Sequence, residues 1–407
     1  MNIKSLLLGS AAALAAVSGA RAADAVVVAE PEPVEYVRIC DVYGAGFYYI
    51  PGTETCLKVG GYIRYDLRTG KGGYGGLNNV TDKLDLVRAN QELADARATW
   101  DAGLKDYQVA NPGSTKDDYI AAGNPEPTRR AVKTNDTYFN RARAAMQLDA
   151  RSETELGTLR GYMHINFDWN TVVGAGGLTD TASNMGINHA FLELGGFRIG
   201  KTDSLFASFT GYAGAVIEDD LIPYAAGKYD TQQIVYTYKS GNGFSAAVGL
   251  EAGSFANTID SYVPHVVAGA AYTQAWGGIS GVVGYDSNYE EWAGKVRLDV
   301  NASDTVSLWV MGGYGTDKNA SRYFYKGWGG NWAVWGGGTV KFNKQTSFNA
   351  QVSYAENRDL AVVANIAYTI VPGFKITPEI AWTSYHTDDK VKISDGFGGM
   401  VRFQRSF

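Results

Sequence analysis

Alternation of apolar and polar side chains is the feature of this 407-residue sequence that most restricts its fold. In the stretch 360–370 every second residue is apolar, and a similar pattern recurs at 243–250, 306–314 and 348–354. A period of two residues is typical of a β-strand with one apolar face, whereas a helix would repeat every 3.6 residues. The sequence therefore predicts an all-β chain.

The connections between these strands alternate in length. Short turn sequences occur at 240–243, 301–304, 343–346 and 371–373, and longer stretches such as 251–264 and 316–330 lie between them. This rhythm is typical of an antiparallel barrel whose short turns all lie at one end, which is the periplasmic end in outer-membrane barrels. We predict sixteen strands at 56–68, 137–151, 158–169, 187–195, 197–206, 231–239, 243–251, 264–274, 278–286, 291–300, 305–315, 331–342, 346–356, 360–370, 374–385 and 397–407.

The stretch 69–136 interrupts this pattern. It is long and charged, and its residues 81–107 repeat at roughly helical spacing. We expect a large first extracellular loop there. A hidden pair of strands is the alternative, and it would raise the count to eighteen.

Period two does not distinguish a membrane barrel from a soluble β-sandwich, which remains the alternative fold. The composition favours the barrel, with 50 Gly, 26 Tyr and 9 Trp but only 10 Pro. Aromatic residues such as Trp292, Tyr314 and Trp332 fall near predicted strand ends, where an interfacial girdle requires them. We therefore predict a 16-stranded antiparallel transmembrane β-barrel.

The N-terminus reads as a signal peptide over residues 1–22, with Lys4 before a short apolar stretch and Ala20-Arg21-Ala22 as the cleavage site. The mature single domain would be 23–407, beginning with a periplasmic segment 23–55. Cys40 and Cys56 are the only cysteines, and in an oxidising compartment we expect one disulfide between them, with two free thiols as the alternative. Removing Lys4 and Arg21 changes the net charge from −6 to −8, which argues against a nucleic-acid partner.

An enzyme is not indicated. The four histidines, at 164, 189, 265 and 386, have no metal-ligand spacing, and no catalytic Ser–His arrangement is evident. We expect no catalytic residue, no metal and no cofactor.

The C-terminal stretch 397–407 alternates and ends in Phe407, like the assembly signal of outer-membrane barrels. At this point the chain resembles the general porins of alphaproteobacteria, from its signal peptide to its end apart from 70–135. The residues that carry the resemblance are Glu35-Tyr36-Val37-Arg38, Cys40-Asp41, Tyr49–Leu57 (YIPGTETCL), Gly61–Asp66 (GYIRYD), Ser152–Leu159 (SETELGTL), Gly241–Ser245 (GNGFS) and Val401–Phe407.

The resemblance implies a homotrimer in the outer membrane of a Gram-negative cell, in contact with its lipids and lipopolysaccharide. It also implies passive diffusion of small hydrophilic solutes and ions through a water-filled channel. A sugar-selective channel is the alternative function. Such a channel needs a track of aromatic residues, and Tyr62 and Tyr162 alone do not make one.

The resemblance further implies that a third loop, 207–230, folds into the lumen and narrows it. This loop carries the acidic triplet Glu218, Asp219 and Asp220. If the apolar residues of each strand face lipid, alternation points a set of arginines inward, namely Arg64, Arg141, Arg143, Arg160 and Arg402. We therefore expect an acidic loop opposite a basic wall, with Glu218, Asp219 and Asp220 facing Arg64, Arg141, Arg143 and Arg160.

Overall fold

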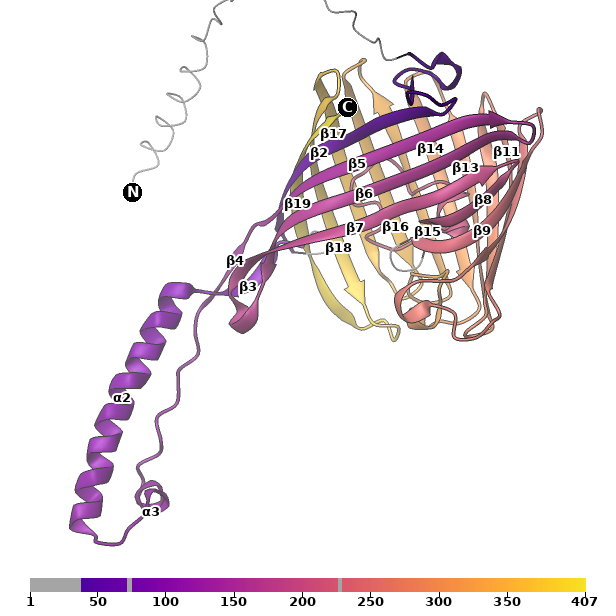
Figure 1. The fold of residues 1–407 in the computed structure, drawn as a ribbon. Helices are drawn as coiled ribbons and strands as arrows, with labels where there is room; N and C mark the ends of the chain where they lie inside the picture. The colour runs from indigo at the N-terminus through magenta and orange to yellow at the C-terminus, as the bar shows by residue number, and fades with distance from the viewer. Residues whose placement is uncertain (1–37, 72–74, 226–228) are drawn as a thin grey trace, which may run out of the picture. The chain divides into compact units, whose positions relative to one another are not determined.

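The sheet in the computed structural model closes into a barrel (Figure 1). The structure describes residues 38–71, 75–225 and 229–407, so the predicted signal peptide lies outside the described residues. The main sheet has 17 strands, of which the two-residue β1 (Tyr48–Tyr49) only flanks β2, and the other sixteen form the ring. They are β2 (Cys56–Gly70), β5 (Phe139–Thr154), β6 (Gly157–Val173), β7 (Thr179–Leu194), β8 (Phe197–Asp203), β9 (Asp230–Lys239), β10 (Phe244–Glu251), β11 (His265–Gln274), β12 (Gly277–Asp286), β13 (Glu291–Asn301), β14 (Val306–Gly315), β15 (Trp332–Lys341), β16 (Thr346–Ala355), β17 (Leu360–Val371), β18 (Phe374–His386) and β19 (Lys392–Ser406).

All neighbours in the ring are antiparallel, and β19 pairs with β2 to close it. Beyond that pairing, the N–H of Gly61 donates to the C=O of Phe407 (3.1 Å), so the last residue of the chain is held to the first barrel strand. Closure removes the exposed edges that an open sheet would carry. The predicted sixteen-stranded antiparallel barrel is confirmed.

The two faces of the barrel wall differ as the alternation predicts. On β17 and β18 the apolar Ile366 and Ile380 are 46% and 66% exposed. The polar Asn365 and Glu379 beside them are 3% and 2% exposed. Successive side chains of a strand point to opposite faces, so the apolar set is on the outside and the polar set is on the inside of the barrel.

The barrel wall is uneven in height at β7 and β8. Strand β7 begins at Thr179, eight residues before the predicted start at position 187, because β6 and β7 form one long hairpin around a turn at 174–178. Strand β8 is only seven residues long and pairs with β7 from Ala190 to Leu194. The earlier part of β7 therefore extends beyond its pairing with β8.

The first loop does not add strands to the barrel. Its β3 (Leu77–Thr81) and β4 (Thr134–Thr137) pair with each other in a separate two-stranded sheet, so the eighteen-strand alternative is wrong. Between them lie α2 (Lys83–Ala110) and α3 (Lys116–Ala121). Within the described ranges, no helix has the length and apolar character needed to cross a membrane.

The helical part of the first loop is capped and tied at its base. Asp82 accepts a hydrogen bond from the N–H of Asp85 and so caps α2. Arg130, on the segment between α3 and β4, donates to Asp85 in α2 (2.9 Å). This hydrogen bond holds the pKa of the Asp85 carboxyl well below its usual range. Thr81 donates to the C=O of Gly176 (2.8 Å), which links β3 to the turn between β6 and β7.

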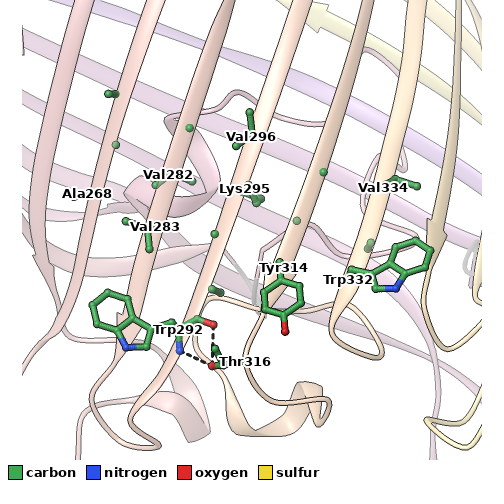
Figure 2. Close-up of a pocket in the computed structure, with 18 residues that line it drawn as sticks. Ala268, Val282, Val283, Trp292, Lys295, Val296, Tyr314, Thr316, Trp332 and Val334 are labelled. Carbon is green, nitrogen blue, oxygen red and sulfur yellow. Dashed lines mark hydrogen bonds between the residues drawn. The ribbon is translucent and has the colours of Figure 1, made fainter.

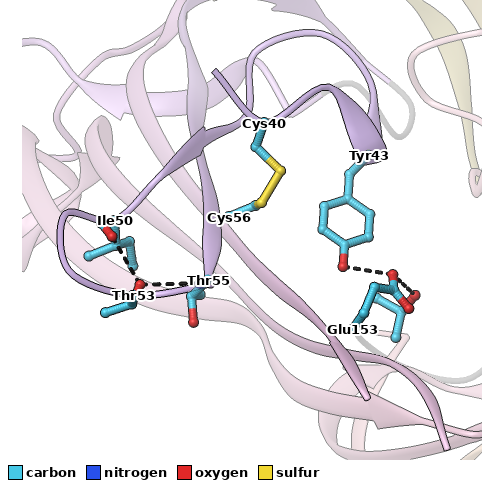
Figure 3. The surroundings of a disulfide bond; sticks show 8 residues. Cys40, Tyr43, Ile50, Thr53, Thr55, Cys56 and Glu153 are labelled. Atoms are coloured by element: carbon cyan, nitrogen blue, oxygen red, sulfur yellow. Dashed lines mark hydrogen bonds between the residues drawn. A yellow bond between two sulfur atoms is a disulfide. The ribbon is translucent and has the colours of Figure 1, made fainter. Parts of the chain in front are cut away.

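The predicted disulfide joins Cys40 to Cys56, with the two Cα atoms 6.0 Å apart (Figure 3). It ties the segment that precedes the barrel to the first residue of β2. Phe47 is buried beside the disulfide, and the Tyr43 hydroxyl donates to Glu153 on β5 (2.7 Å). The segment is thus fixed to the barrel by a covalent bond, apolar contacts and a hydrogen bond.

Candidate functional site

The connection between β8 and β9 folds into the barrel. The structure describes residues 204–225 and 229 of it, and 204–225 is called the inner loop here. The predicted strand 197–206 ends early, at Asp203, because Ser204 caps the short helix α4 (Leu205–Ser208). Glu251 on β10 accepts hydrogen bonds from the Ser204 hydroxyl (2.8 Å) and the Leu205 N–H (2.7 Å). The wall of the barrel therefore sets the point at which the chain turns inward.

One side of the inner loop packs against the apolar part of the inner wall. Phe206, Ala207, Ala213 and Ile222 are at most 1% exposed, and they belong to the same cluster as wall residues such as Val267, Met311 and Trp335. The Lys295 ammonium on β13 lies 4.7 Å from the centre of the Phe206 ring and 5.2 Å from that of Tyr224. Removal of this apolar surface from water stabilises the position of the inner loop on the apolar part of the inner wall.

The backbone of the inner loop is held by side chains of the wall, which satisfy polar groups that would otherwise be buried without partners. Glu379 accepts from the N–H of Ile217 (2.5 Å) and from that of Glu218 (2.9 Å). Four wall side chains donate to loop carbonyls: Asn365 to Ala215 (3.1 Å), Gln351 to Asp219 (2.7 Å), Tyr385 to Leu221 (3.1 Å) and Trp335 to Ile222 (2.8 Å).

The acidic triplet lies at the edge of this packed region. Glu218 forms an ion pair with Arg68 on β2 (2.6 Å), and both side chains are 15% exposed. Asp219 accepts a hydrogen bond from the Tyr224 hydroxyl (2.9 Å). Burial, together with the neighbouring charge of Asp220, raises the pKa of the Glu218 carboxyl and that of the Asp219 carboxyl to about 7, although Arg68 acts in the opposite direction on Glu218.

The predicted arginines do point inward, but carboxylates of the wall itself pair with four of the five. Asp66, which is fully buried, accepts from Arg141 (2.5 Å) and from Arg402 (2.7 Å). Further along the wall, Arg143 pairs with Asp168 (2.7 Å), and Arg160 pairs with Asp149 (2.9 Å) and Glu193 (2.8 Å). Among the described residues, the ion pair between the acidic triplet and the wall is formed by Arg68, and none is formed by Arg64, Arg141, Arg143 or Arg160.

Arg64 and Lys375, which lie near the ion-paired arginines of the wall, have no ion pair among the described residues. Arg64 donates to the Gln404 side chain (2.9 Å), and Lys375 is the cross-strand neighbour of Gln404 on its other side. Both lie in one row across β18, β19 and β2. Neither Lys375 nor the partner carboxylates are among the predicted site residues, although each of them occupies an inward position of its strand.

A space remains between the inner loop and the charged wall. A cavity of about 370 Å³ is lined by both, with Tyr212, Ile217 and Asp219 from the loop and Lys375, Arg402 and Gln404 from the wall. Its lining is therefore polar and carries charges of both signs. On its other side the inner loop packs against wall residues such as Val267, Met311 and Trp335.

A second hollow, of about 930 Å³, lies on the outer face of the barrel over β11–β15 (Figure 2). Its lining includes the outward-facing Trp292, Tyr314 and Trp332, which are 40–58% exposed, together with Gly294 and Gly312. Because it is apolar and faces away from the lumen, this hollow does not belong to a path for hydrophilic solutes.

The comparisons with known proteins agree with this architecture. A family model described as Porin subfamily matches residues 24–106 and 118–400. The match includes most of the stretch 70–135, so the family resemblance is wider than the sequence motifs indicated. Porin Omp2a of Brucella melitensis is 43% identical over 429 residues, and Porin Omp2b of Brucella suis is 43% identical over 421 residues, each with 100% of both chains covered.

Among solved structures, the outer membrane channel DcaP of Acinetobacter baumannii is similar with a TM-score of 0.58 at 16% identity, covering 88% of this chain and 99% of DcaP. A triple mutant of the Rhodopseudomonas blastica porin has a TM-score of 0.50 at 13% identity, covering 86% of this chain and 100% of that one. These two likenesses concern the fold alone. The chain belongs to the porin subfamily, and it is an integral β-barrel of the outer membrane that forms a porin channel.

Proposed function

We propose that the inner loop is the constriction of this channel, and that small hydrophilic solutes and ions pass it by passive diffusion. The ion pair between Glu218 and Arg68 carries the proposal, because it brings the acidic part of the inner loop against the charged wall. The cavity bounded by Asp219, Lys375 and Arg402 then lies beside the path of the solute. Pore width and the charges that line a pore are the main determinants of its selectivity.

The two sides of this gap carry excess charge of opposite sign, negative on the loop side and positive on the wall side. Asp219 lines the gap on the loop side, next to Glu218 with its partner Arg68, whereas Arg64 and Lys375 on the wall side have no ion pair among the described residues. The resulting transverse field orders water in the gap. An apolar solute must disturb that ordered water, so hydrophilic solutes are favoured.

A sugar-selective channel remains the second candidate, because the structure brings more aromatic rings together than the sequence indicated. A row of inward rings runs along β2, β6 and β7, with centroids 5.3–6.1 Å apart: Tyr62, His164, His189, Tyr162 and Phe191. However, the guanidinium groups of Arg64 and Arg160 lie 4.5 and 4.7 Å from the centres of the Tyr62 and Tyr162 rings. A sugar would have to displace these cations to stack, so general diffusion is favoured.

The two candidates differ in the concentration dependence of flux. General diffusion gives flux that rises linearly with solute concentration, whereas a sugar site gives saturation. Uptake of glucose, maltose and neutral amino acids into proteoliposomes separates them. Saturation by one sugar, lost in Tyr162→Ala, would favour the selective channel.

We further propose that the channel is a homotrimer in contact with outer-membrane lipids and lipopolysaccharide, with its short turns in the periplasm. The porin family supports the trimer. The exposed apolar outer face supports the lipid contact. Single-channel records that close in three equal steps would support the trimer, and single closures in every record would contradict it.

The constriction is tested by removing charge from the inner loop. In Asp219→Asn with Asp220→Asn we expect the reversal potential in a salt gradient to move toward anion selectivity. Asp117→Asn, which removes an exposed charge from α3, is the matched control and is expected to leave the potential unchanged. An unchanged potential in the double variant would show that the inner loop does not line the path.

A further inference from the structure

The connection between β14 and β15, residues 316–331, is also folded inward. As a long connection between strands it is expected to be exposed, yet its middle carries a dense set of large side chains that are at most 4% exposed. They are Tyr323, Phe324, Tyr325, Lys326 and Trp328. A loop with so little exposed surface is packed as tightly as a core element, and it occupies the same half of the barrel as the packed side of the inner loop.

This β14–β15 loop is fixed to the wall at its centre. The N–H of Phe324 donates to Asp286 (2.6 Å), and the Phe324 ring stacks on His265 with centroids 5.1 Å apart and planes 12° apart. Asn257, in the connection between β10 and β11, donates to the C=O of Tyr323 (3.0 Å). The loop is thus held by a carboxylate, an aromatic stack and a neighbouring loop.

Two glycines of the wall make room for it. A Cβ atom at Gly284 would lie 2.5 Å from the Tyr325 ring, and one at Gly313 would lie 2.9 Å from the Trp328 ring. Any larger residue at these two inward positions would displace the loop from the wall. The inner wall is therefore shaped to receive these two rings.

The β14–β15 loop also contacts the back of the inner loop directly. The Tyr325 ring lies 5.1 Å from that of Phe206. At Gly327 the backbones approach so closely that a Cβ atom there would lie 2.5 Å from the C=O of Ala225. Trp328 packs edge-on to Trp335 (5.4 Å), whose indole N–H donates to the C=O of Ile222.

From these contacts we infer that the β14–β15 loop is a positioning element that holds the inner loop toward the charged wall and thereby sets the width of the channel. The inference rests on the proposed role of the inner loop as the constriction. Wall side chains form hydrogen bonds with the backbone of the inner loop at 215–222. Phe206 and Ala225, in contrast, pack against the β14–β15 loop. Without these contacts the end of the inner loop has room to move away from the charged wall, and the cavity between the inner loop and that wall widens.

Replacement of residues 318–329 by a short Gly-Ser turn tests this inference. Strands β14 and β15 remain paired up to Tyr314 and Trp332, so the wall itself keeps its hydrogen bonds. We expect a higher single-channel conductance, a larger size limit for sugars in liposome swelling, and more current noise. Heat-dependent mobility on gels reports whether the barrel has folded.

The matched control shortens a loop that makes no described contact with the inner loop. Replacement of residues 84–121, the helical part of the first loop, by the same turn is expected to leave the size limit unchanged. If both replacements enlarge the size limit alike, the effect is one of loop removal at the mouth, and the inference is overturned.

A single substitution provides an independent test without shortening the chain. Gly327→Val places side-chain atoms where Ala225 lies, so we expect an altered size limit and noisier current. Gly241→Val, in the turn between β9 and β10, is the control because a Cβ atom there meets nothing within 4 Å. A folded Gly327→Val channel with the conductance and size limit of the parent would overturn the inference.

Failure of this inference and failure of the proposed constriction give different results. If Asp219→Asn with Asp220→Asn shifts ion selectivity but the loop replacement leaves the size limit unchanged, the inner loop is the constriction and holds its position unaided. If neither change has an effect, the inner loop does not line the path at all.

Discussion

Arg68 on the first barrel strand and Glu218 on the inner loop meet at 2.6 Å, although 150 positions separate them in the sequence (218 − 68). The pair is mostly buried, and Glu379 fixes the Glu218 backbone from the other side. The tip of the inner loop is therefore held between a cation of the wall and a carboxylate of the wall.

Removal of one partner of this pair should change both charge and position. Glu218→Gln leaves Arg68 as an unpaired cation, so we expect the reversal potential in a KCl gradient to move toward anion selectivity. Arg68→Gln should move it toward cation selectivity, and the double variant should return close to the parent value. Shifts of the same sign in the two single variants would contradict a charge pair beside the path.

The unpaired cations of the wall should attract anions. Arg64→Gln with Lys375→Gln removes two positive charges that no described carboxylate neutralises. We expect a larger shift toward cation selectivity than in Arg129→Gln with Arg130→Gln, which also removes two positive charges but from the first loop, where Arg129 donates to Asn90 and Arg130 is paired with Asp85. Equal shifts in the two variants would indicate that only the total charge of the protein matters.

Ion selectivity should depend on pH near neutrality. The pKa of Glu218 and that of Asp219 are raised to about 7, chiefly by burial, with Asp220 adding to both. Arg68, Arg402 and Glu379 also act on Glu218. These carboxylates gain protons as the pH falls from 8 to 6, so the loop loses negative charge and selectivity should move toward anions.

The pH dependence has a direct control. Glu218→Gln with Asp219→Asn cannot titrate at these positions, so its reversal potential should stay nearly constant between pH 8 and pH 6. A pH response in that variant equal to the parent response would assign the titration to other groups.

The disulfide should stabilise the chain without shaping the pore. Cys40 and Cys56 are 16 positions apart, and closing a loop of about that size is worth about 3 kcal/mol in the chain-entropy model. Cys40→Ser with Cys56→Ser should lower the unfolding temperature and leave conductance unchanged. Reductant should lower the unfolding temperature of the parent to that of the variant, and an unchanged temperature in both would refute the stabilising role.

The barrel was predictable from the sequence because lipid on one side and water on the other impose period two on every strand. The start of β7 was not, because its segment before Ile187 is largely polar and lacks the alternation on which the prediction depends. The helix in the first loop was predictable from its own spacing. That β3 and β4 pair outside the barrel depends on tertiary contacts such as Thr81 to Gly176.

The site was predictable in part. Alternation correctly pointed the arginines inward, but their partners depend on strand register. Asp66 lies directly across from Arg141 on one side and from Arg402 on the other, and a shift of one residue would have separated them. The inward fold of the β14–β15 loop had a visible signal, since Tyr323-Phe324-Tyr325 and Trp328 are unusually apolar for an exposed loop.

Thiol labelling can show whether the inner loop borders the path of the permeating solute. The chain has only two cysteines and both are in the disulfide, so Asp219→Cys introduces a single reactive thiol. A charged, membrane-impermeant thiosulfonate reagent added during single-channel recording should lower the conductance of this variant and leave the parent unchanged. If mass spectrometry shows that Cys labelling is complete while the conductance does not change, the inner loop does not border the path.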